Sequence, residues 1–288
     1  MAKRTAEDDE TSASTRPALS RPGLINFTGE DGLCVLYTTD VTQNSEALLE
    51  CLRSQPYMPK VSTFPSWPNL SSNDYVWTVD PQTDLAAHDA FYPFSRAHRN
   101  PLPPHPMPAQ VLALRDVAFA LVCKCVPDLT DQDKPNAALL NRYRDGNAKL
   151  SAHSDADPWL AGCDDGTPTL VLSISFGATR TLVFRHKKIK GRKHSFAMQN
   201  NSLLVMVGAE TQANWTHEVP RESGGTAIGE RYNITFRTVS VERVPLQMRW
   251  LQRQAMDQYR EGYKLALQRT ESNTDADELM RRLQKHVN

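Results

Sequence analysis

The sequence has no excess of charge of either sign, because its 288 residues include 33 Lys and Arg and 33 Asp and Glu. Proteins that hold nucleic acid through many phosphates usually carry a basic excess, so any such contact here must rest on a local patch. No apolar run approaches the roughly 20 residues of a membrane-spanning helix, and MAKRTAEDDETSAS at the N-terminus lacks the apolar stretch of a secretory signal. These absences predict an intracellular protein, of the nucleus or the cytoplasm, with no membrane partner.

Cysteine is also scarce. The five cysteines are an odd number and lack the paired spacing of a zinc finger; they are Cys34, Cys51, Cys123, Cys125 and Cys163. Reduced thiols in an intracellular compartment are the natural interpretation. No internal repeat is apparent, which excludes a solenoid.

Composition divides the chain into three parts. Residues 1–22 are polar and rich in Ser, Thr and Pro, and they are predicted to be a disordered tail. Residues 23–243 are predicted to form one domain, and residues 244–288 a helical C-terminal extension. Within the domain, residues 56–108 are dense in Pro, Ser, Asn and aromatic residues. They are predicted to form a lid whose rings either stack on a ligand or fasten the loops to the core.

Periodicity predicts the regular elements of the domain. Apolar residues at helical spacing predict a helix over residues 107–122, and an earlier helix begins near Ser45 and stops at Pro56. Apolar and alternating segments predict strands over residues 32–38, 138–143, 169–175, 181–186, 195–198, 202–207, 213–219 and 231–237. The fold class is therefore α+β, with a double-stranded β-helix (jelly roll) core, supporting N-terminal helices and an extra C-terminal helical tail.

His153 and Asp155 form a His-x-Asp pair within the segment Asn141–Asp157. On an extended segment, residues i and i+2 point to the same face, so the imidazole and the carboxylate converge. They would supply two of the three ligands of a facial triad for non-haem Fe(II). Such a pair also arises by chance. The best candidate for the third ligand is His217, in a predicted strand near the end of the barrel region, although a histidine packed in the core is the alternative.

Arg231 and Arg237 stand at the two ends of the alternating segment RYNITFR. Their spacing is even, so both project to the same face of a strand. Two guanidinium groups directed into one interior are costly to bury unless they meet anions. Arg binds carboxylates in bidentate fashion, and 2-oxoglutarate offers a carboxylate at each end. In the alternative, one Arg is exposed on an edge strand and the other pairs with Asp or Glu.

The run Leu140–Arg237 resembles the AlkB family of Fe(II)/2-oxoglutarate-dependent dioxygenases, especially its nucleic-acid dealkylating members. The resemblance covers about a third of the chain strongly. Its blocks are, in order, Asn141-x-Tyr143 with Gly146, His153-x-Asp155, SISFGATRTLVFRHK at 173–187, SLLVM at 202–206, Trp215-Thr216-His217 and Arg231–Arg237.

The resemblance implies an oxidoreductase that uses Fe(II), 2-oxoglutarate as co-substrate and O2. His153, Asp155 and His217 would bind the iron. Arg231 and Arg237 would engage the two ends of 2-oxoglutarate, with added hydrogen bonds from Asn141, Tyr143 and Asn233. Asp157 falls where family members use an acidic residue to contact the substrate base or to order the site. Ala156 departs from the family pattern and leaves the substrate open.

Two substrate classes are consistent with the sequence. The first is dealkylation, chiefly demethylation, of N-alkylated DNA or RNA bases, with release of succinate, CO2 and formaldehyde. A base flipped out of its duplex would stack on rings of the lid, such as Tyr75, Trp77, Phe91 or Tyr92. The second is a small-molecule or amino-acid-type substrate in a biosynthetic pathway, which zero net charge and Ala156 fit.

The turn at residues 187–193 is basic and would meet phosphates under the first hypothesis, unless it is only a solvated hairpin; its cations are Lys187, Lys188, Lys190, Arg192 and Lys193. A third interpretation, a non-enzymatic jelly-roll binding module with a dead site, is disfavoured because every expected ligand type is present. The protein is expected to act as a monomer.

Overall fold

Two β-sheets make up the core of the protein in the computed structural model, which describes residues 25–29, 31–57, 73–83, 105–156 and 170–240. The large sheet has the strand order β1 (Ile25–Thr28), β2 (Cys34–Thr39), β10 (Ser202–Val207), β7 (Leu170–Gly177), β12 (Arg231–Arg237), β5 (Ala137–Tyr143), β3 (Asp74–Val79) and β4 (His105–Pro106). The small sheet has the order β6 (Leu150–His153), β11 (Trp215–Val219), β8 (Arg180–His186) and β9 (Lys193–Met198). This architecture confirms the predicted α+β jelly roll.

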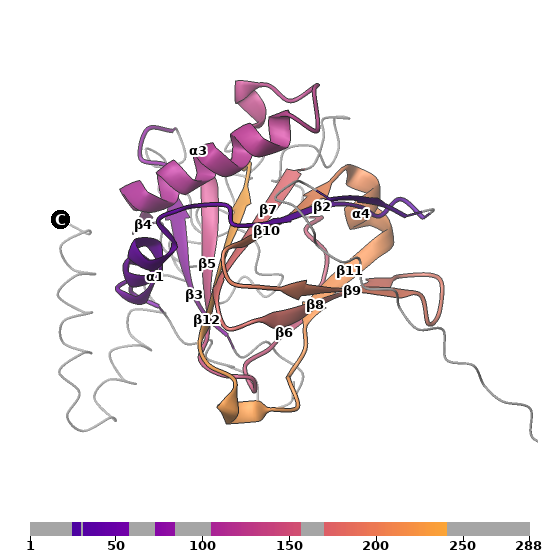
Figure 1. Ribbon diagram of the computed structural model, residues 1–288. Helices are drawn as coiled ribbons and strands as arrows, with labels where there is room; N and C mark the ends of the chain where they lie inside the picture. The colour runs from indigo at the N-terminus through magenta and orange to yellow at the C-terminus, as the bar shows by residue number, and fades with distance from the viewer. Residues whose placement is uncertain (1–24, 30, 58–72, 84–104, 157–169, 241–288) are drawn as a thin grey trace, which may run out of the picture.

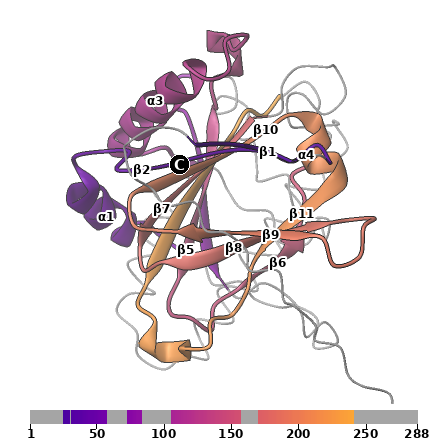
Figure 2. The same ribbon diagram turned by 45° about the vertical axis from the view of Figure 1, so that its right-hand side comes forward.

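Two helices cover the outer face of the large sheet (Figures 1 and 2). They are α1 (Ser45–Arg53) and α3 (Ala109–Cys123). Leu52 of α1 and Phe119 of α3 share one buried cluster with alternate residues of the central strands, including Ile174 of β7. Removing this apolar surface from water is the main favourable term that holds the helices to the sheet. The N-terminal helices therefore support the sheet, as the predicted fold class has it.

The two faces of strand β12 are both buried, one under the helices and the other between the two sheets. Every residue of β12 is buried, and the residues of even number, Tyr232, Ile234 and Phe236, belong to the cluster under the helices. Because side chains alternate along a strand, the residues of odd number face the space between the two sheets. They are the polar Arg231, Asn233, Thr235 and Arg237.

Strand β7 repeats this division beside β12, to which it pairs in antiparallel register. Leu172 and Ile174 pack under the helices, while the alternate positions Ser173 and Ser175 are buried polar residues. A second apolar cluster closes the rest of the space between the sheets. The interior is therefore apolar at one end and polar along β7 and β12, where chemistry becomes possible.

One predicted element is wrong at its start. The strand expected over residues 213–219 begins only at Trp215, and it is preceded by a short helix, α4 (Ala209–Asn214). Helix α4 is held by tertiary bonds: the hydroxyl of Thr211 accepts from the backbone N–H of Cys34 at 3.0 Å, and its hydrogen lies within reach of the carbonyls of Val207 at 2.8 Å and Gly32 at 3.1 Å. A single turn held by such distant contacts leaves no periodic signal in the sequence.

The predicted N-terminal tail and the C-terminal extension lie outside the described residues. Of the predicted lid, the structure describes strand β3, which belongs to the large sheet between β5 and β4. Two single turns, η1 (Asp131–Asp133) and η2 (Gly225–Ala227), complete the elements. Across the described ranges, no helix has both the length and the apolar character that crossing a membrane requires.

Arg180 fastens the loops at one end of the barrel. Its side chain is 0% exposed, and its guanidinium donates to the carbonyls of Asp145, Ala148 and Pro220 at 2.9, 2.7 and 2.6 Å. The turn after β5 is thereby joined to the loop after β11, and the side chain of Glu222 lies 3.7 Å away to balance the charge.

We expect Arg180→Met to lower the free energy of unfolding by about 3–5 kcal/mol, because it leaves buried carbonyls and a carboxylate without their partner. Arg185→Met is the matched control, since Arg185 lies on the same strand but is 52% exposed and pairs with Glu218 at the surface. An exposed pair contributes below about 1 kcal/mol. Urea unfolding at pH 7 measures both, and equal losses would contradict the role given to Arg180.

Candidate metal centre and co-substrate pocket

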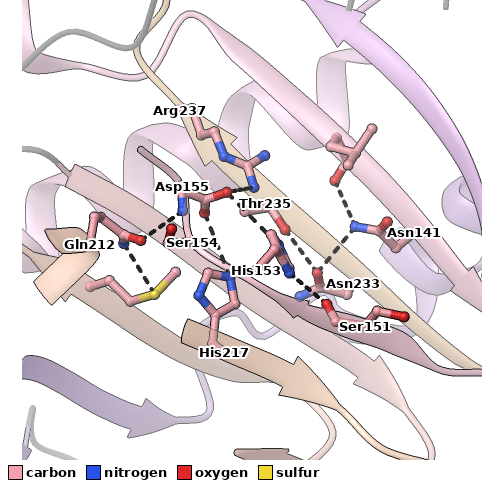
Figure 3. A network of polar contacts seen from close by, with 12 residues as sticks. Asn141, Ser151, His153, Ser154, Asp155, Gln212, His217, Asn233, Thr235 and Arg237 are labelled. Carbon is pink, nitrogen blue, oxygen red and sulfur yellow. Dashed lines mark hydrogen bonds and ion pairs between the residues drawn. The ribbon is translucent and has the colours of Figure 1, made fainter. Parts of the chain in front are cut away.

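Three side chains that can bind a metal converge between the sheets (Figure 3). His217 of β11 lies directly opposite His153 of β6 in the antiparallel register, and Asp155 follows β6 by two residues. Nε2 of His153 and Nε2 of His217 lie 3.9 and 3.8 Å from the two carboxylate oxygens of Asp155. One ligand atom from each residue falls within 4.8 Å of the others. Strand pairing thus brings together two histidines that are 64 residues apart in the sequence.

The protonation states suit metal binding. Burial lowers the pKa of His217 to about 3, with His153 adding to the effect and Asp155 opposing it. Burial alone would raise the pKa of Asp155, but Arg237, His217 and His153 outweigh it and bring that pKa to about 2. At pH 7 the imidazole of His217 is therefore neutral and the carboxylate is ionised. A metal requires both ligands in these deprotonated forms.

Neighbouring groups orient the three ligands. Nδ1 of His153 lies 2.9 Å from the carbonyl of Ser151, so a neutral ring that donates from Nδ1 presents a bare Nε2 to the centre. Nη2 of Arg237 donates to Oδ1 of Asp155 at 2.8 Å, while Oδ2 is buried and has no hydrogen-bond partner among the residues that the structure describes. Two imidazoles and one carboxylate with a free oxygen are the donor set of a non-haem Fe(II) site, so the residues present fit that metal.

Arg231 forms the second part of the site. It is 1% exposed, and its Nη2 donates to the hydroxyl of Ser175 at 2.9 Å. Its Nε and Nη1 have no acceptor among the described residues. Burial lowers the pKa of Arg231, an effect that Tyr143 opposes. A buried cation with donors that lack an acceptor fits an anionic ligand such as a carboxylate.

Tyr143 lies beside two cations. The guanidinium carbon of Arg231 lies 4.8 Å from the centre of its ring and that of Arg180 lies 5.6 Å away. Its hydroxyl is buried beside Arg231, and each of these two groups shifts the pKa of the other. The Tyr143 hydroxyl and the guanidinium of Arg231 together mark a candidate site for an anion.

A chain of hydrogen-bonded amides runs across β3, β5 and β12 beside Arg231. Asn73 donates to Asn141 at 2.8 Å, Asn141 donates to Asn233 at 3.4 Å, and Asn233 donates to the hydroxyl of Ser173 at 2.8 Å. The hydroxyl of Thr235 donates to Asn233 at 2.9 Å. Asn141 and Asn233, expected to bind 2-oxoglutarate, are thus brought together and held by their neighbours.

Of the residues predicted to contact the substrate, the structure describes Tyr75 and Trp77. Tyr75 stands opposite Asn141 across β3 and β5, and Trp77 is 1% exposed on the same strand; both alternate with Val76, which packs under the helices. Their side of β3 therefore faces the pocket. Asp157, Phe91 and Tyr92 lie outside the described residues, so their predicted roles stay predictions.

Two cations of the basic turn are already engaged within the protein. Nζ of Lys187 donates to the hydroxyl of Ser154 at 3.1 Å and to the carbonyl of Gln212 at 2.7 Å, and Arg192 pairs with Asp31 at 2.6 Å. The turn itself is organised by Nδ1 of His186, which accepts two backbone N–H groups. Phosphate contacts would therefore fall mainly to the other three cations, Lys188, Lys190 and Lys193.

Sequence reasoning missed three kinds of residue at the site. Ser173 and Ser175 could have been found, because hydroxyls at alternate positions interrupt the apolar run of β7. Asn73 and Gln212 left no such signal, since each is positioned by contacts with residues more than 50 places away.

The sequence is similar to those of known proteins. Residues 39–237, more than half of the 288-residue chain, match the 2OG-Fe(II) oxygenase superfamily. The chain is 38% identical over 112 residues to the alpha-ketoglutarate-dependent dioxygenase alkB homolog 3 of Rattus norvegicus, across 36% of this chain and 35% of that protein. It is 35% identical over 111 residues to the DNA oxidative demethylase ALKBH2 of Homo sapiens, across 36% of this chain and 40% of that protein.

The chain thus spans well under half the length of these curated relatives. Among solved structures, it is similar to "The structure of OsALKBH1", with a TM-score of 0.47 and 15% identity, across 74% of this chain and 100% of that chain.

We expect Mn(II), a redox-stable probe, to raise the melting temperature of the apo-protein, because an ion that binds only the folded state stabilises it. The gain is about 2.7 kcal/mol at 100 times the dissociation constant. His217→Ala should abolish the shift. His194→Ala is the control, since His194 packs against Phe27 and Trp215 and makes no part of the triad. A full shift in His217→Ala would rule out this centre.

Arg231→Met should weaken 2-oxoglutarate binding to the Mn(II)-loaded protein by about 30-fold or more, since losing one partner of a buried charge pair costs at least about 2 kcal/mol. The apo-protein should be equally or more stable, because the substitution removes a buried charge. Arg142→Met, on the outer face of β5 where Arg142 pairs with Glu230, should bind normally. Calorimetry measures the affinities; unchanged binding in Arg231→Met would contradict the pocket.

Proposed function

The chain belongs to the 2OG-Fe(II) oxygenase superfamily, and on that premise we propose that it demethylates N-alkylated bases in DNA or RNA, releasing succinate, CO2 and formaldehyde. The observation that carries the proposal is the triad of His153, Asp155 and His217 beside the buried, partly unpaired Arg231. The substrate class is supported by similarity to relatives that include a protein named DNA oxidative demethylase. It is a proposal for the whole protein, because the matched segments cover little more than a third of either chain.

The proposed roles follow from the geometry. His153, Asp155 and His217 hold Fe(II), which together with 2-oxoglutarate supplies the O2 chemistry that oxidises a substrate C–H bond. Arg231 and Tyr143 receive one carboxylate of 2-oxoglutarate. Asn141, Asn233 and Arg237 line the path from there to the triad, and Arg237 also keeps Asp155 ionised.

The substrate is proposed to enter from the side of β3. Tyr75 stands opposite Asn141 and offers a ring near the co-substrate pocket. Trp77, Phe91 and Tyr92 are proposed to stack on the flipped base or its neighbours, and Asp157 to contact the base. The exposed lysines of the turn between β8 and β9, Lys188, Lys190 and Lys193, are proposed to meet phosphates.

Residues 23–243 are proposed as the catalytic domain, which the family match over residues 39–237 supports. One chain supplies every candidate ligand, so we propose that it acts as a monomer. Free thiols at the four described cysteines support an intracellular location in the nucleus or cytoplasm.

Formaldehyde and succinate release should both rise when the Fe(II)-loaded protein receives an oligonucleotide with N-methylated bases. The unmethylated oligonucleotide is the matched control, because it offers the same phosphates and no methyl group. Turnover with a free amino acid or another small molecule, and none with the methylated strand, would replace this proposal with a biosynthetic oxygenase. Absence of Fe(II) binding and of any 2-oxoglutarate turnover would instead indicate a binding module.

In the same assay, Lys188→Ala combined with Lys190→Ala should raise the KM for the oligonucleotide, most strongly near physiological salt, and leave kcat unchanged. Lys124→Ala, an exposed lysine at the end of α3, tests whether loss of any surface charge has this effect. Equal changes in both variants would remove the turn from the proposed interface.

A further inference from the structure

Asp155 stands beyond the strand that precedes it, so the sheet does not fix its position. Strand β6 ends at His153, whose partner across the sheet is His217. Among the described residues, two hydrogen bonds hold Asp155: its carboxylate accepts from Arg237, and its backbone N–H donates to Oε1 of Gln212 at 2.8 Å. The first bond sets one carboxylate oxygen, and the second anchors the backbone from which the carboxylate extends.

The hydrogen bonding of Gln212 does not suit a residue that only stabilises the fold. It is 3% exposed. Among the described residues its Nε2 donates to the thioether sulfur of Met206 at 3.5 Å and to no other acceptor, and a thioether is a weak acceptor. Burying an amide with so weak a partner costs free energy that an apolar side chain of the same size would avoid. Within the same part of the chain, the stronger bond of the side chain is the one to Asp155 (Figure 3).

The position of Gln212 in the chain joins two ligand segments. Gln212 lies in α4, five residues before His217, and β11 follows α4 directly. Its side chain therefore links the backbone that carries His217 to the backbone that carries Asp155. A displacement of either segment would be transmitted to the other through this bond.

Lys187 links the same two ligand segments from the solvent side. Its Nζ donates to the carbonyl of Gln212 and to the hydroxyl of Ser154, the residue between His153 and Asp155. Its backbone N–H donates to the carbonyl of Asn214 at 2.8 Å, which ties the end of β8 to the end of α4. A cation is well suited to the carbonyl end of a helix.

We propose that Gln212, assisted by Lys187, is a positioning residue of the metal centre, which sets where the carboxylate of Asp155 lies relative to the two histidines. This inference rests on the proposed function, since it concerns the same metal centre. Gln212 acts through Asp155 and is not a metal ligand itself.

The test measures Co(II) binding to the purified full-length apo-protein by the visible absorption of the bound ion, without any activity assay. Gln212→Leu should lower Co(II) affinity by about 10- to 100-fold, the usual effect of losing a group that orients a metal ligand, and should alter the spectrum. Gln212→Glu keeps an oxygen in place to accept from Asp155 and should restore most of the affinity.

Thr211→Val is the matched control within α4. Thr211 is equally buried, but its hydroxyl bonds to Gly32 and Cys34 and leaves the ligand segment untouched. We expect this variant to lose melting temperature and keep wild-type Co(II) affinity. Equal affinity losses in Thr211→Val and Gln212→Leu would show that α4 matters only for stability, and would overturn the proposal.

A second variant serves if Gln212→Leu fails to fold. Removing a positive charge near a cation site should tighten metal binding by simple electrostatics. Lys187→Met should instead weaken Co(II) binding, by about tenfold, because it releases Ser154 and Gln212. Lys188→Met removes the same charge from the next residue and should not weaken it. Tighter or unchanged binding in Lys187→Met would overturn the proposal.

The two proposals fail in different ways. If wild-type protein binds no Co(II), or His153→Ala binds it as well as wild type, the metal centre and the proposed function fail together. If wild type binds Co(II), His153→Ala does not, and Gln212→Leu matches wild type, only the positioning role of Gln212 fails.

Discussion

Arg237 and Asp155 meet between the two sheets as an ion pair 2.8 Å apart, with about 5% of each side chain exposed. Burying two charges is expensive, and an ion pair repays the loss only when its geometry is good and its remaining donors and acceptors find partners. Here the pair keeps a buried carboxylate ionised, which a metal ligand must be. It also joins the last strand of the large sheet to the loop after β6, so the centre cannot form until both sheets are in place.

The same constraint explains why β12 is built with two different faces. Its apolar residues hold α1 and α3 to the outside of the sheet, and this burial supplies stability that the other face lacks. On the inner face Arg231 keeps donors without acceptors among the described residues. A buried, incompletely paired cation lowers stability, so its presence indicates a site kept for a ligand. The large sheet tolerates this loss of stability because the helices on its opposite face bury apolar surface and stabilise it.

Three separate segments carry the triad and the two residues, Gln212 and Lys187, that we propose to position it. Register places His217 opposite His153, Gln212 reaches the backbone of Asp155 from α4, and the end of β8 brings in Lys187. None of these contacts lies within one element. The cations of the basic turn therefore fall into two groups. Lys187 and Arg192 bind other parts of the protein, while the remaining lysines face solvent.

The sequence by itself determined the elements whose signals are local. Alternation in RYNITFR predicted which of its side chains share a face, and helical spacing predicted α3, because burial on one face imposes a period on neighbouring residues. The His-x-Asp pair and the two arginines could be selected for the same reason. A capping residue and Pro56 predicted the bounds of α1. Tertiary structure alone decided that Arg237 meets Asp155, that Arg231 keeps unused donors, and that a short helix replaces the start of a predicted strand. These outcomes depend on contacts between residues far apart in the chain, and such contacts leave no periodic trace in either partner.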